Sequence, residues 1–589
     1  MIKQTFFYLL LLSIIFAACQ PEPVPIASSP PQAASLTNPP LSTLTKTATS
    51  LTNLPLTPTP VHPPIIMTTS PFIENTLSAL TLEQKIGQVM IIGLDGTTVD
   101  PELRQMIAEY HVGGIILFAR NVQSPAQVAQ LTNQLQTIAR ESGHPGLFIA
   151  VDQEAGRVAR LTGETGFTEF PSAMALTAIG DPQNARQVAA AMALEMRAVG
   201  INVDFAPDLD VNNNPSNPVI GIRSFSSDPQ KVVEYGLAFA KGLQENGVLA
   251  VGKHFPGHGD TSVDSHIDLP LVPHDRARLD QIELVPFRAA IEADIAGIMS
   301  AHVTFPAIDD TPGLAATLSR PVLTGLLRNE LGYNGLIFTD SLEMGALAAN
   351  GYPPQVGAPL ALAAGADLLL FNRDHAMHRE AFANLVEAVR SGKIAQAQLD
   401  DSVRRILAAK QRYGILTPVL VDAEAASSLV KTSEHLNLAA NLAARSITLI
   451  RDPQALIPLD KSLAALVLEA PALRGQASGF GSTILAVDSQ PTRSQIADVI
   501  HAARGGRLVI FPVYDLALNP QQQELIQQLI QAGNPVIAIV CRNPFDIVRL
   551  PQEVTVLVSY GFNFPAREAL KEILAGTLQP IGVLPVDLP

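Results

Sequence analysis

Eight short apolar runs alternate with longer amphipathic stretches between residues 72 and 415. Near-continuous hydrophobic segments of this length are typical of parallel β-strands that are covered on both faces. The runs are Val89–Leu94, Gly114–Phe118, Gly146–Val151, Ile201–Phe205, Val248–Gly252, Gly297–Ala301, Gly335–Thr339 and Asp367–Phe371. Helical stretches such as Pro125–Arg140, Pro229–Glu245 and Leu279–Ala293 lie between them. The alternation predicts an α/β fold whose first domain, residues 72–415, is a (β/α)8 barrel of the TIM type.

Ionisable side chains follow the ends of these runs. They are Asp152 and Glu154, then Asp204, Asp208 and Asp210, then Lys253 and His254, then His302, and then Asp340 and Glu343, with Asn372 after the last run. One such carboxylate alone, for example Asp152, is equally well explained as a helix N-cap. Active sites of the barrel fold gather at the C-terminal ends of the strands. The whole set therefore predicts an active site at that end.

Residues 446–589 repeat the alternation with a second set of elements. Six apolar runs occur there, at Ile447–Ile450, Ala464–Leu468, Ile484–Val487, Leu508–Val513, Val536–Val540 and Val554–Val558. They predict a smaller three-layer α/β sandwich domain of the doubly wound type, joined to the barrel by a linker and a connecting helix over residues 416–445. Gly505 and Gly506 precede a run instead of following one, so we expect neither a nucleotide nor another cofactor.

The first 71 residues resemble an export signal followed by a tether. Lys3 precedes an apolar run from Phe6 to Ala18, which is too short to span a bilayer as a helix. Small residues directly before Cys19 resemble a bacterial lipoprotein cleavage site, which would make Cys19 the acylated residue of a membrane-anchored protein in the cell envelope. Phe16 departs from the usual leucine, so the alternatives are an ordinary cleaved signal peptide, which would give a secreted protein, and an uncleaved anchor. Residues 20–71, rich in Pro, Thr and Ser, predict a disordered tether.

The composition indicates which kinds of molecule the protein is not suited to bind. A formal net charge of −15 argues against a nucleic-acid partner, which requires a basic face. The other cysteine, Cys541, lies in an apolar run and is expected in the core. The sequence leaves the oligomeric state open.

The stretch Lys253–His266 contains three histidines, one lysine and two aspartates. Pro256, Gly257 and Gly259 predict that it forms a loop after a buried strand. Within it, Asp264 stands two residues before His266 and can accept the imidazole N–H, which makes the ring more basic. Asp340 ends an apolar run, so its carboxylate is held on the scaffold. A fixed carboxylate can attack an anomeric carbon while a histidine serves as acid and base.

Four motifs in this order resemble glycoside hydrolase family 3. They are Asp152–Val158, Lys253–Gly259, Asp264–His266 and Thr339–Met344. The subgroup that they resemble is the bacterial β-N-acetylglucosaminidases that act on peptidoglycan fragments. The resemblance covers the whole barrel and extends to the closing Gly582–Val586.

The resemblance implies a retaining mechanism in which Asp340 is the nucleophile and His266, supported by Asp264, is the acid/base. It implies that Asp152, Arg160, Arg223, Lys253 and His254 hold the terminal sugar. The expected substrate is a small carbohydrate ending in GlcNAc, from a muropeptide or a chitin-type oligosaccharide. His258 and His302 are open to a substrate role or a structural one. A metal site made of His254, His258, Asp264 and His266 is not expected, because the Asp-x-His spacing already has an explanation without metal.

Three alternatives stay open at this point. A phosphorylase would use phosphate in place of water, and a histidine acid/base would not repel that dianion as a carboxylate would. A β-glucosidase or β-xylosidase of the same family is less compatible with the Asp-x-His loop. A surface glycan-binding protein would have no need of Asp340, Asp264 and His266.

Overall fold

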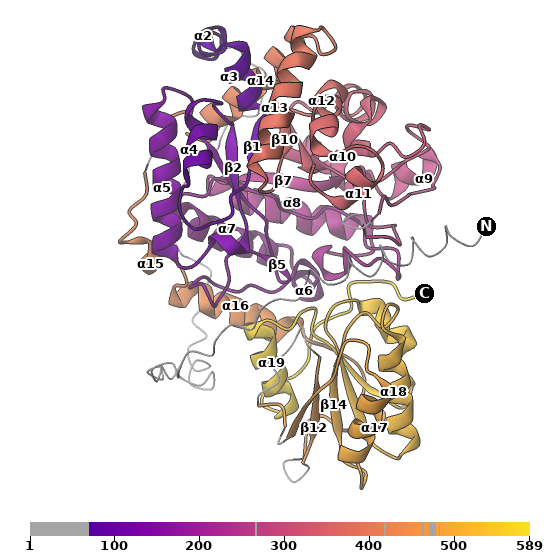
Figure 1. Ribbon diagram of the computed structural model, residues 1–589. Helices are drawn as coiled ribbons and strands as arrows, with labels where there is room; N and C mark the ends of the chain where they lie inside the picture. Colours follow the sequence, from indigo (N-terminus) through magenta and orange to yellow (C-terminus); the bar gives the residue numbers. More distant parts are fainter. Residues whose placement is uncertain (1–69, 265–267, 418–419, 461–463, 471–478, 482) are drawn as a thin grey trace, which may run out of the picture. The chain divides into compact units, whose positions relative to one another are not determined.

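The computed structural model describes residues 70–264, 268–417, 420–460, 464–470, 479–481 and 483–589. Eight parallel strands form a closed barrel in the order β1-β10-β9-β8-β7-β6-β3-β2 (Figure 1). The strands are β1 (Met90–Ile92), β2 (Gly114–Leu117), β3 (Phe148–Val151), β6 (Val203–Asp204), β7 (Leu249–Phe255), β8 (Gly297–Ser300), β9 (Leu336–Ser341) and β10 (Leu368–Leu370). Each overlaps one of the eight predicted runs, which confirms the predicted fold class.

Helices cover the outer face of the barrel (Figure 1). They are α3 (Leu82–Gln88), α4 (Pro101–Ala108), α5 (Pro125–Glu141), α7 (Gln183–Ala198), α8 (Pro229–Glu245), α9 (Arg276–Gln281), α10 (Val285–Glu292), η5 (Pro321–Glu330), α12 (Pro354–Ala364), α13 (His375–Arg390) and α14 (Gln396–Arg412). Their starts follow from local chemistry. The Ser124 hydroxyl accepts from the backbone N–H of Gln127, directly before a proline at the first helical position of α5. A capping side chain and a proline with a preset φ both favour a helix start.

The predicted helix Leu279–Ala293 is wrong as one element, because the structure divides it into α9 and α10. Pro286 explains the division. Proline has no backbone N–H and its ring clashes with the preceding turn, so it is tolerated only in the first turn of a helix. The chain therefore ends α9 at Gln281 and begins α10 at Val285, one residue before Pro286.

Strand β7 is longer than its apolar run. Lys253 and His254 were expected on the loop, but they lie within β7, and Lys253 pairs with Met299 of β8. All seven residues of β7 are buried. The apolar pattern ends at Gly252 because the next two residues are polar. Their side chains have charged partners at the C-terminal end of the barrel, which are described below, so they can be buried within a strand. The strand itself continues through them.

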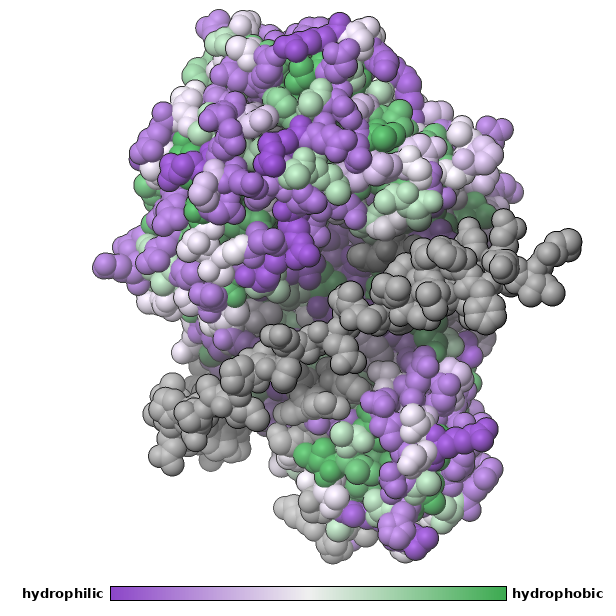
Figure 2. Space-filling model, viewed as in Figure 1, coloured by the Kyte–Doolittle hydropathy of each residue, from purple (hydrophilic) through white to green (hydrophobic). Residues whose placement is uncertain are grey.

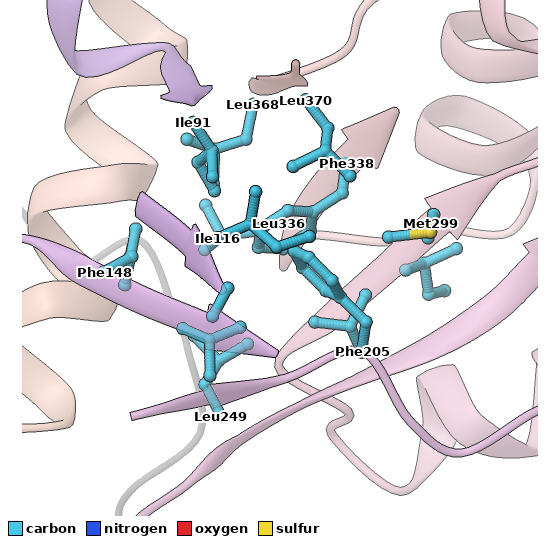
Figure 3. Close-up of a cluster of buried hydrophobic side chains, with 14 of the residues drawn as sticks. Ile91, Ile116, Phe148, Phe205, Leu249, Met299, Leu336, Phe338, Leu368 and Leu370 are labelled. Atoms are coloured by element: carbon cyan, nitrogen blue, oxygen red, sulfur yellow. The ribbon is translucent and has the colours of Figure 1, made fainter. Parts of the chain in front are cut away.

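Side chains from the barrel strands meet in one apolar cluster (Figure 3). Ile91, Ile116, Phe148, Phe205, Leu249, Met299, Leu336, Phe338, Leu368 and Leu370 belong to it, and none is more than 3% exposed. The rings of Phe205 and Phe338 meet nearly edge to face, with centroids 5.6 Å apart. The strands thus enclose a packed core, and the polar residues at their C-terminal ends rest on a rigid base.

The second sheet has six strands in the order β11-β16-β15-β14-β12-β13. Its strands are β11 (Thr448–Arg451), β12 (Leu466–Glu469), β13 (Thr483–Ala486), β14 (Val509–Val513), β15 (Val536–Val540) and β16 (Thr555–Val558), all parallel except β11. Helices α17 (Arg493–Ala502) and α18 (Pro520–Gln531) pack with one face, and α16 (Ser433–Ser446) and α19 (Phe564–Leu574) with the other. This is the predicted three-layer α/β architecture. The domain limits at residues 72, 415 and 446 stay predictions.

Figure 2 shows mostly hydrophilic side chains over the barrel helices, with hydrophobic ones scattered among them. Across the described residues, the helices are too short or too polar to span a lipid bilayer. Cys19 and the tether predicted for residues 20–71 lie outside the described residues, apart from the last two positions of the tether. The lipid anchor therefore stays a prediction.

Lys410 of α14 is fully buried at the N-terminal end of the barrel. Its Nζ donates to Gln88 Oε1 at 2.8 Å and lies 5.1 Å from the centroid of the Phe148 ring. Burial lowers the pKa of Lys410 to about 7. Above pH 7 this lysine is protonated to a greater extent in the unfolded chain than in the folded chain. The free energy of unfolding therefore increases as the pH rises towards 10.5.

We expect Lys410→Met to stabilise the protein at pH 7 and to lose most of that advantage at pH 9.5. The difference between the two chains in the free energy of unfolding should shrink by about 3 kcal/mol, because only the wild type has a lysine at this position to titrate. Urea unfolding of both chains at the two pH values measures it. A difference that is the same at both values would show that Lys410 is charged to the same extent in the folded and unfolded chain.

Candidate active site

A pocket of about 510 Å³ opens at the C-terminal end of the barrel. This volume lies within the range of small-molecule sites. Its lining includes all the described residues of the predicted site: Asp152, Arg160, Arg223, Lys253, His254, Asp264 and Asp340. His266 lies outside the described residues, and Asp264 is the last described residue before it. Asp152 and Asp340 are 188 positions apart in the sequence, and both line this pocket. This is expected for residues at the C-terminal ends of barrel strands.

Lys253 is the centre of a buried ion network. Its Nζ lies 2.9 Å from Asp152 Oδ1 and 2.5 Å from Glu154 Oε1, and its side chain is 3% exposed. Arg223 donates both Nε and Nη2 to the Glu154 carboxylate at 2.8 Å. On the solvent side, Arg160 Nη2 lies 3.1 Å from Asp152 Oδ2. The network holds each charged group in one position, ready to bond the hydroxyls of a sugar.

The network also sets the charge of its members. Burial opposes ionisation of Glu154, but the cations of Arg223 and Lys253 outweigh it and lower its pKa to about 2. Burial likewise opposes the charge of Lys253, while Asp152 and Glu154 raise its pKa above the usual value. Both groups are therefore charged at neutral pH. The sequence drew attention to Glu154 as a strand-end residue but did not assign it to the sugar site. Its pairing with Arg223, 69 positions away, is what marks it in the structure.

Asp210 fixes the orientation of His254. Its Oδ2 lies 2.7 Å from His254 Nδ1, and its Oδ1 accepts from the backbone N–H of His258 at 2.6 Å. Nδ1 then carries the proton donated to Asp210, so the other ring nitrogen of His254 faces Arg223 Nη2 at 3.4 Å. This geometry gives Asp210 a structural role, since its carboxylate holds both a pocket side chain and the turn that follows β7.

The histidines left open in the sequence have structural partners. His258 Nδ1 lies 2.9 Å from Thr261 Oγ1, and Asn217 Nδ2 donates to the backbone oxygen of His258 at 2.9 Å. His302 Nε2 donates to the backbone oxygen of Ser341 at 2.9 Å, while its Nδ1 lies 2.9 Å from Thr317 Oγ1. His302 thus supports the end of β9 beside Asp340.

Asp340 lies in β9 and faces the pocket. Its Oδ1 accepts from the backbone N–H of Ser341 at 2.7 Å. Burial opposes its ionisation, but the nearby rings of His302 and His254 keep the pKa of Asp340 below its usual value. The result is a carboxylate that is ionised at neutral pH and fixed on a strand. Such a group can act as a nucleophile towards an anomeric carbon.

Two further side chains shape the wall of the pocket. Glu343 accepts from the backbone N–H of Asn372 at 2.7 Å and lies 3.1 Å from His378 Nε2. The Phe118 ring has the guanidinium of Arg120 4.4 Å from its centroid. Glu343 and Asn372 were recognised as strand-end residues, whereas nothing in the sequence selected Phe118, because an aromatic residue after an apolar run is ordinary core.

One trio of buried residues, of which His254 lines the pocket, has donors in metal-binding proximity. Asp208, Asp210 and His254 each offer an atom, and these atoms lie within 4.8 Å of one another. His254 pairs with Asp210, and burial beside Asp210 raises the pKa of Asp208 well above its usual value, so the trio carries less negative charge than two free carboxylates would. A cation is not needed to explain their approach.

The chain is similar in sequence to known glycosidases. The sequence model of the glycosyl hydrolase family 3 N-terminal domain matches residues 81–409. Beta-hexosaminidase A of Pseudoalteromonas piscicida is 35% identical over 554 residues, which is 84% of this chain and 92% of that protein. A beta-hexosaminidase of Alkalilimnicola ehrlichii is 42% identical over 287 residues, 48% of this chain and 79% of that protein.

A solved structure is similar over both sheets. It is a glycoside hydrolase family 3 beta-N-acetylglucosaminidase from Paenibacillus sp. str. FPU-7, with 41% sequence identity and a TM-score of 0.81. The match covers 87% of this chain and 99% of that one. The similarity therefore includes the barrel with its pocket and the second α/β sheet.

Proposed function

Since the chain belongs to glycoside hydrolase family 3 and is a β-hexosaminidase-type glycosidase, we propose that it is a retaining, exo-acting β-N-acetylglucosaminidase. It removes terminal GlcNAc from peptidoglycan fragments or chitin-type oligosaccharides. One observation supports this proposal above the others: an ionised, strand-held Asp340 shares a pocket with the charged groups of Asp152, Lys253 and Arg223 and with Asp264.

In the proposed mechanism Asp340 attacks the anomeric carbon and forms a covalent glycosyl ester. His266 donates its proton to the departing glycosidic oxygen, and Asp264 stabilises the charge of the imidazole. In the second step neutral His266 takes a proton from water, and the hydroxide displaces Asp340 with net retention. Asp152, Arg160, Lys253, Arg223 and His254 hold the sugar hydroxyls in both steps.

For its place in the cell, we propose a lipoprotein whose Cys19 carries the anchor and whose tether, residues 20–71, spaces the barrel from the membrane. Cell-wall fragments outside the cytoplasm would then be within reach.

A substrate panel tests the function. The 4-nitrophenyl β-glycosides of GlcNAc, glucose and xylose are compared, each with and without inorganic phosphate. We expect hydrolysis of the GlcNAc glycoside at a kcat/KM at least about 100-fold above the other two, and free GlcNAc as the product in both buffers. GlcNAc 1-phosphate in the phosphate buffer would identify a phosphorylase instead, and preference for the glucoside or xyloside would reject the assignment.

His266→Ala tests the acid/base role. We expect kcat to fall about 10³-fold for alkyl or sugar aglycones, because their oxygens need a proton as they leave. The first step should be slowed much less for a 2,4-dinitrophenyl glycoside, whose leaving group is stable as an anion. A uniform loss for both classes would assign His266 another role.

A further inference from the structure

A second group of metal-type donors lies outside the lining of the pocket. Asp260, His274 and Glu283 each offer one nitrogen or oxygen atom, and these three atoms lie within 4.8 Å of one another. Asp260 and His274 come from the two ends of the segment between β7 and α9, and Glu283 lies between α9 and α10. The group therefore ties both ends of the segment that contains Asp264 to the start of α10.

Glu283 supplies an observation that is independent of this proximity. The residue is 3% exposed, and its Oε2 is buried with no hydrogen-bond partner among the described residues. Its Oε1 has only long contacts, 3.4 Å to Asn213 Nδ2 and 3.4 Å to Arg278 Nη2. A buried carboxylate is costly unless it is paired, takes up a proton or binds a metal, and burial raises the pKa of Glu283. The unpartnered oxygen points to a cationic ligand.

Arg278 is a weak partner for this group. Its Nη2 lies 3.4 Å from both Asp260 Oδ2 and Glu283 Oε1, whereas a charge-assisted hydrogen bond is usually about 2.7–2.9 Å. Its side chain is 36% exposed, and its Nε is buried without a hydrogen-bond partner among the described residues, so the guanidinium is incompletely satisfied in this position. By contrast, His274 Nε2 lies 2.7 Å from Asp260 Oδ2. Asp260 therefore lies closer to His274 than to the arginine.

We propose that Asp260, His274 and Glu283 form a binding site for a divalent transition metal, with Zn²⁺ as the representative ion. An imidazole with two carboxylates suits Zn²⁺ better than Ca²⁺ or Mg²⁺, which prefer oxygen donors alone. Ligand distances of about 2.0–2.2 Å require small side-chain rotations from the present positions, and water completes the tetrahedron. The bound ion displaces Arg278 and braces the segment that carries Asp264.

Zinc binding by the full chain tests the proposal. The protein, free of any affinity tag, is equilibrated with Zn²⁺ and gel-filtered, and the bound metal is counted by mass spectrometry and titrated by calorimetry. We expect the wild type to bind one equivalent more than His274→Ala. We expect Arg278→Ala to bind at least about fivefold more tightly than the wild type, because a competing cation is removed. A purely structural role of Arg278 would not increase affinity.

Two further variants keep the outcome decisive. His501→Ala removes an exposed histidine of α17 and should keep the wild-type stoichiometry. Asp260→Asn should lose the same equivalent as His274→Ala, which guards against misfolding of one variant. Equal stoichiometry in the wild type, His274→Ala and Asp260→Asn would overturn the proposal, as would unchanged affinity in Arg278→Ala. Glycoside hydrolysis measured in parallel reports on the proposed function separately, since these residues do not line the pocket.

Discussion

Asp340→Ala is expected to lower kcat for aryl β-GlcNAc hydrolysis by about 10⁴-fold or more, the scale seen when a covalent nucleophile is removed. The other carboxylates of the pocket cannot replace it. Asp152 and Glu154 are held by Lys253, and Glu343 is bonded to the backbone of Asn372. Asp340 accepts from a single backbone N–H and faces the pocket.

The binding of GlcNAc to Asp340→Ala should stay within about tenfold of the wild type, because the residues proposed to hold the hydroxyls are unchanged. Azide provides a second measurement. It can enter the space that the carboxylate leaves and attack from the same face, so the product should be the α-glycosyl azide. Asp310→Ala, which removes an exposed carboxylate outside the pocket, serves as the control. Hydrolysis by Asp340→Ala at the rate of that control would remove Asp340 from the mechanism.

The eight barrel strands could be predicted because parallel strands covered on two faces leave an unbroken apolar signature. Apolar runs also located the strands of the second sheet, although β11 there is antiparallel and β13 is largely exposed. The limits of that signature also explain the error at β7. Lys253 and His254 end the apolar run, yet the backbone continues as a strand because Asp152, Glu154 and Asp210 compensate their polar side chains. These partners follow other strands, so the sequence around Lys253 and His254 does not predict the pairing.

The site was predicted by position and not by pairing. The end-of-strand rule selected Asp152, Lys253 and Asp340, which line one pocket in the structure. It could not decide which carboxylate would hold Arg223, since Glu154, Asp208 and Asp210 follow two different strands and are all candidates. Only the folded barrel shows that Glu154 forms the bidentate pair. The proximity of Asp260, His274 and Glu283 could not be predicted from the sequence for the same reason.

Glu154→Gln is expected to have the largest effect on stability, a loss of about 3 kcal/mol in the free energy of unfolding of the barrel. The change removes one charge from a network in which the side chains of Glu154 and Lys253 are 2% and 3% exposed. Lys253 would keep Asp152, and Arg223 would keep Asp208 at 3.6 Å and the ring nitrogen of His254 at 3.4 Å. Removing one partner of a buried pair costs about 3–5 kcal/mol, and the amide oxygen of glutamine recovers part of it.

The dependence on pH separates the charge of Glu154 from its shape. Its pKa is about 2 in the folded chain and near 4.5 when unperturbed, so its stabilising contribution is complete above pH 4.5 and is lost as the pH falls towards 2. Glu154→Gln should therefore lose less stability than the wild type over that interval.

Glu245→Gln provides a matched control. Glu245 pairs with Arg186 on the surface and has 37% of its side chain exposed, so this substitution should lower the free energy of unfolding by less than about 1 kcal/mol. Loosening Lys253 and Arg223 should also raise KM for the GlcNAc glycoside in Glu154→Gln. If Glu154→Gln instead matched Glu245→Gln in stability, acid response and KM, the buried ions would not be what holds the sugar-binding groups in place.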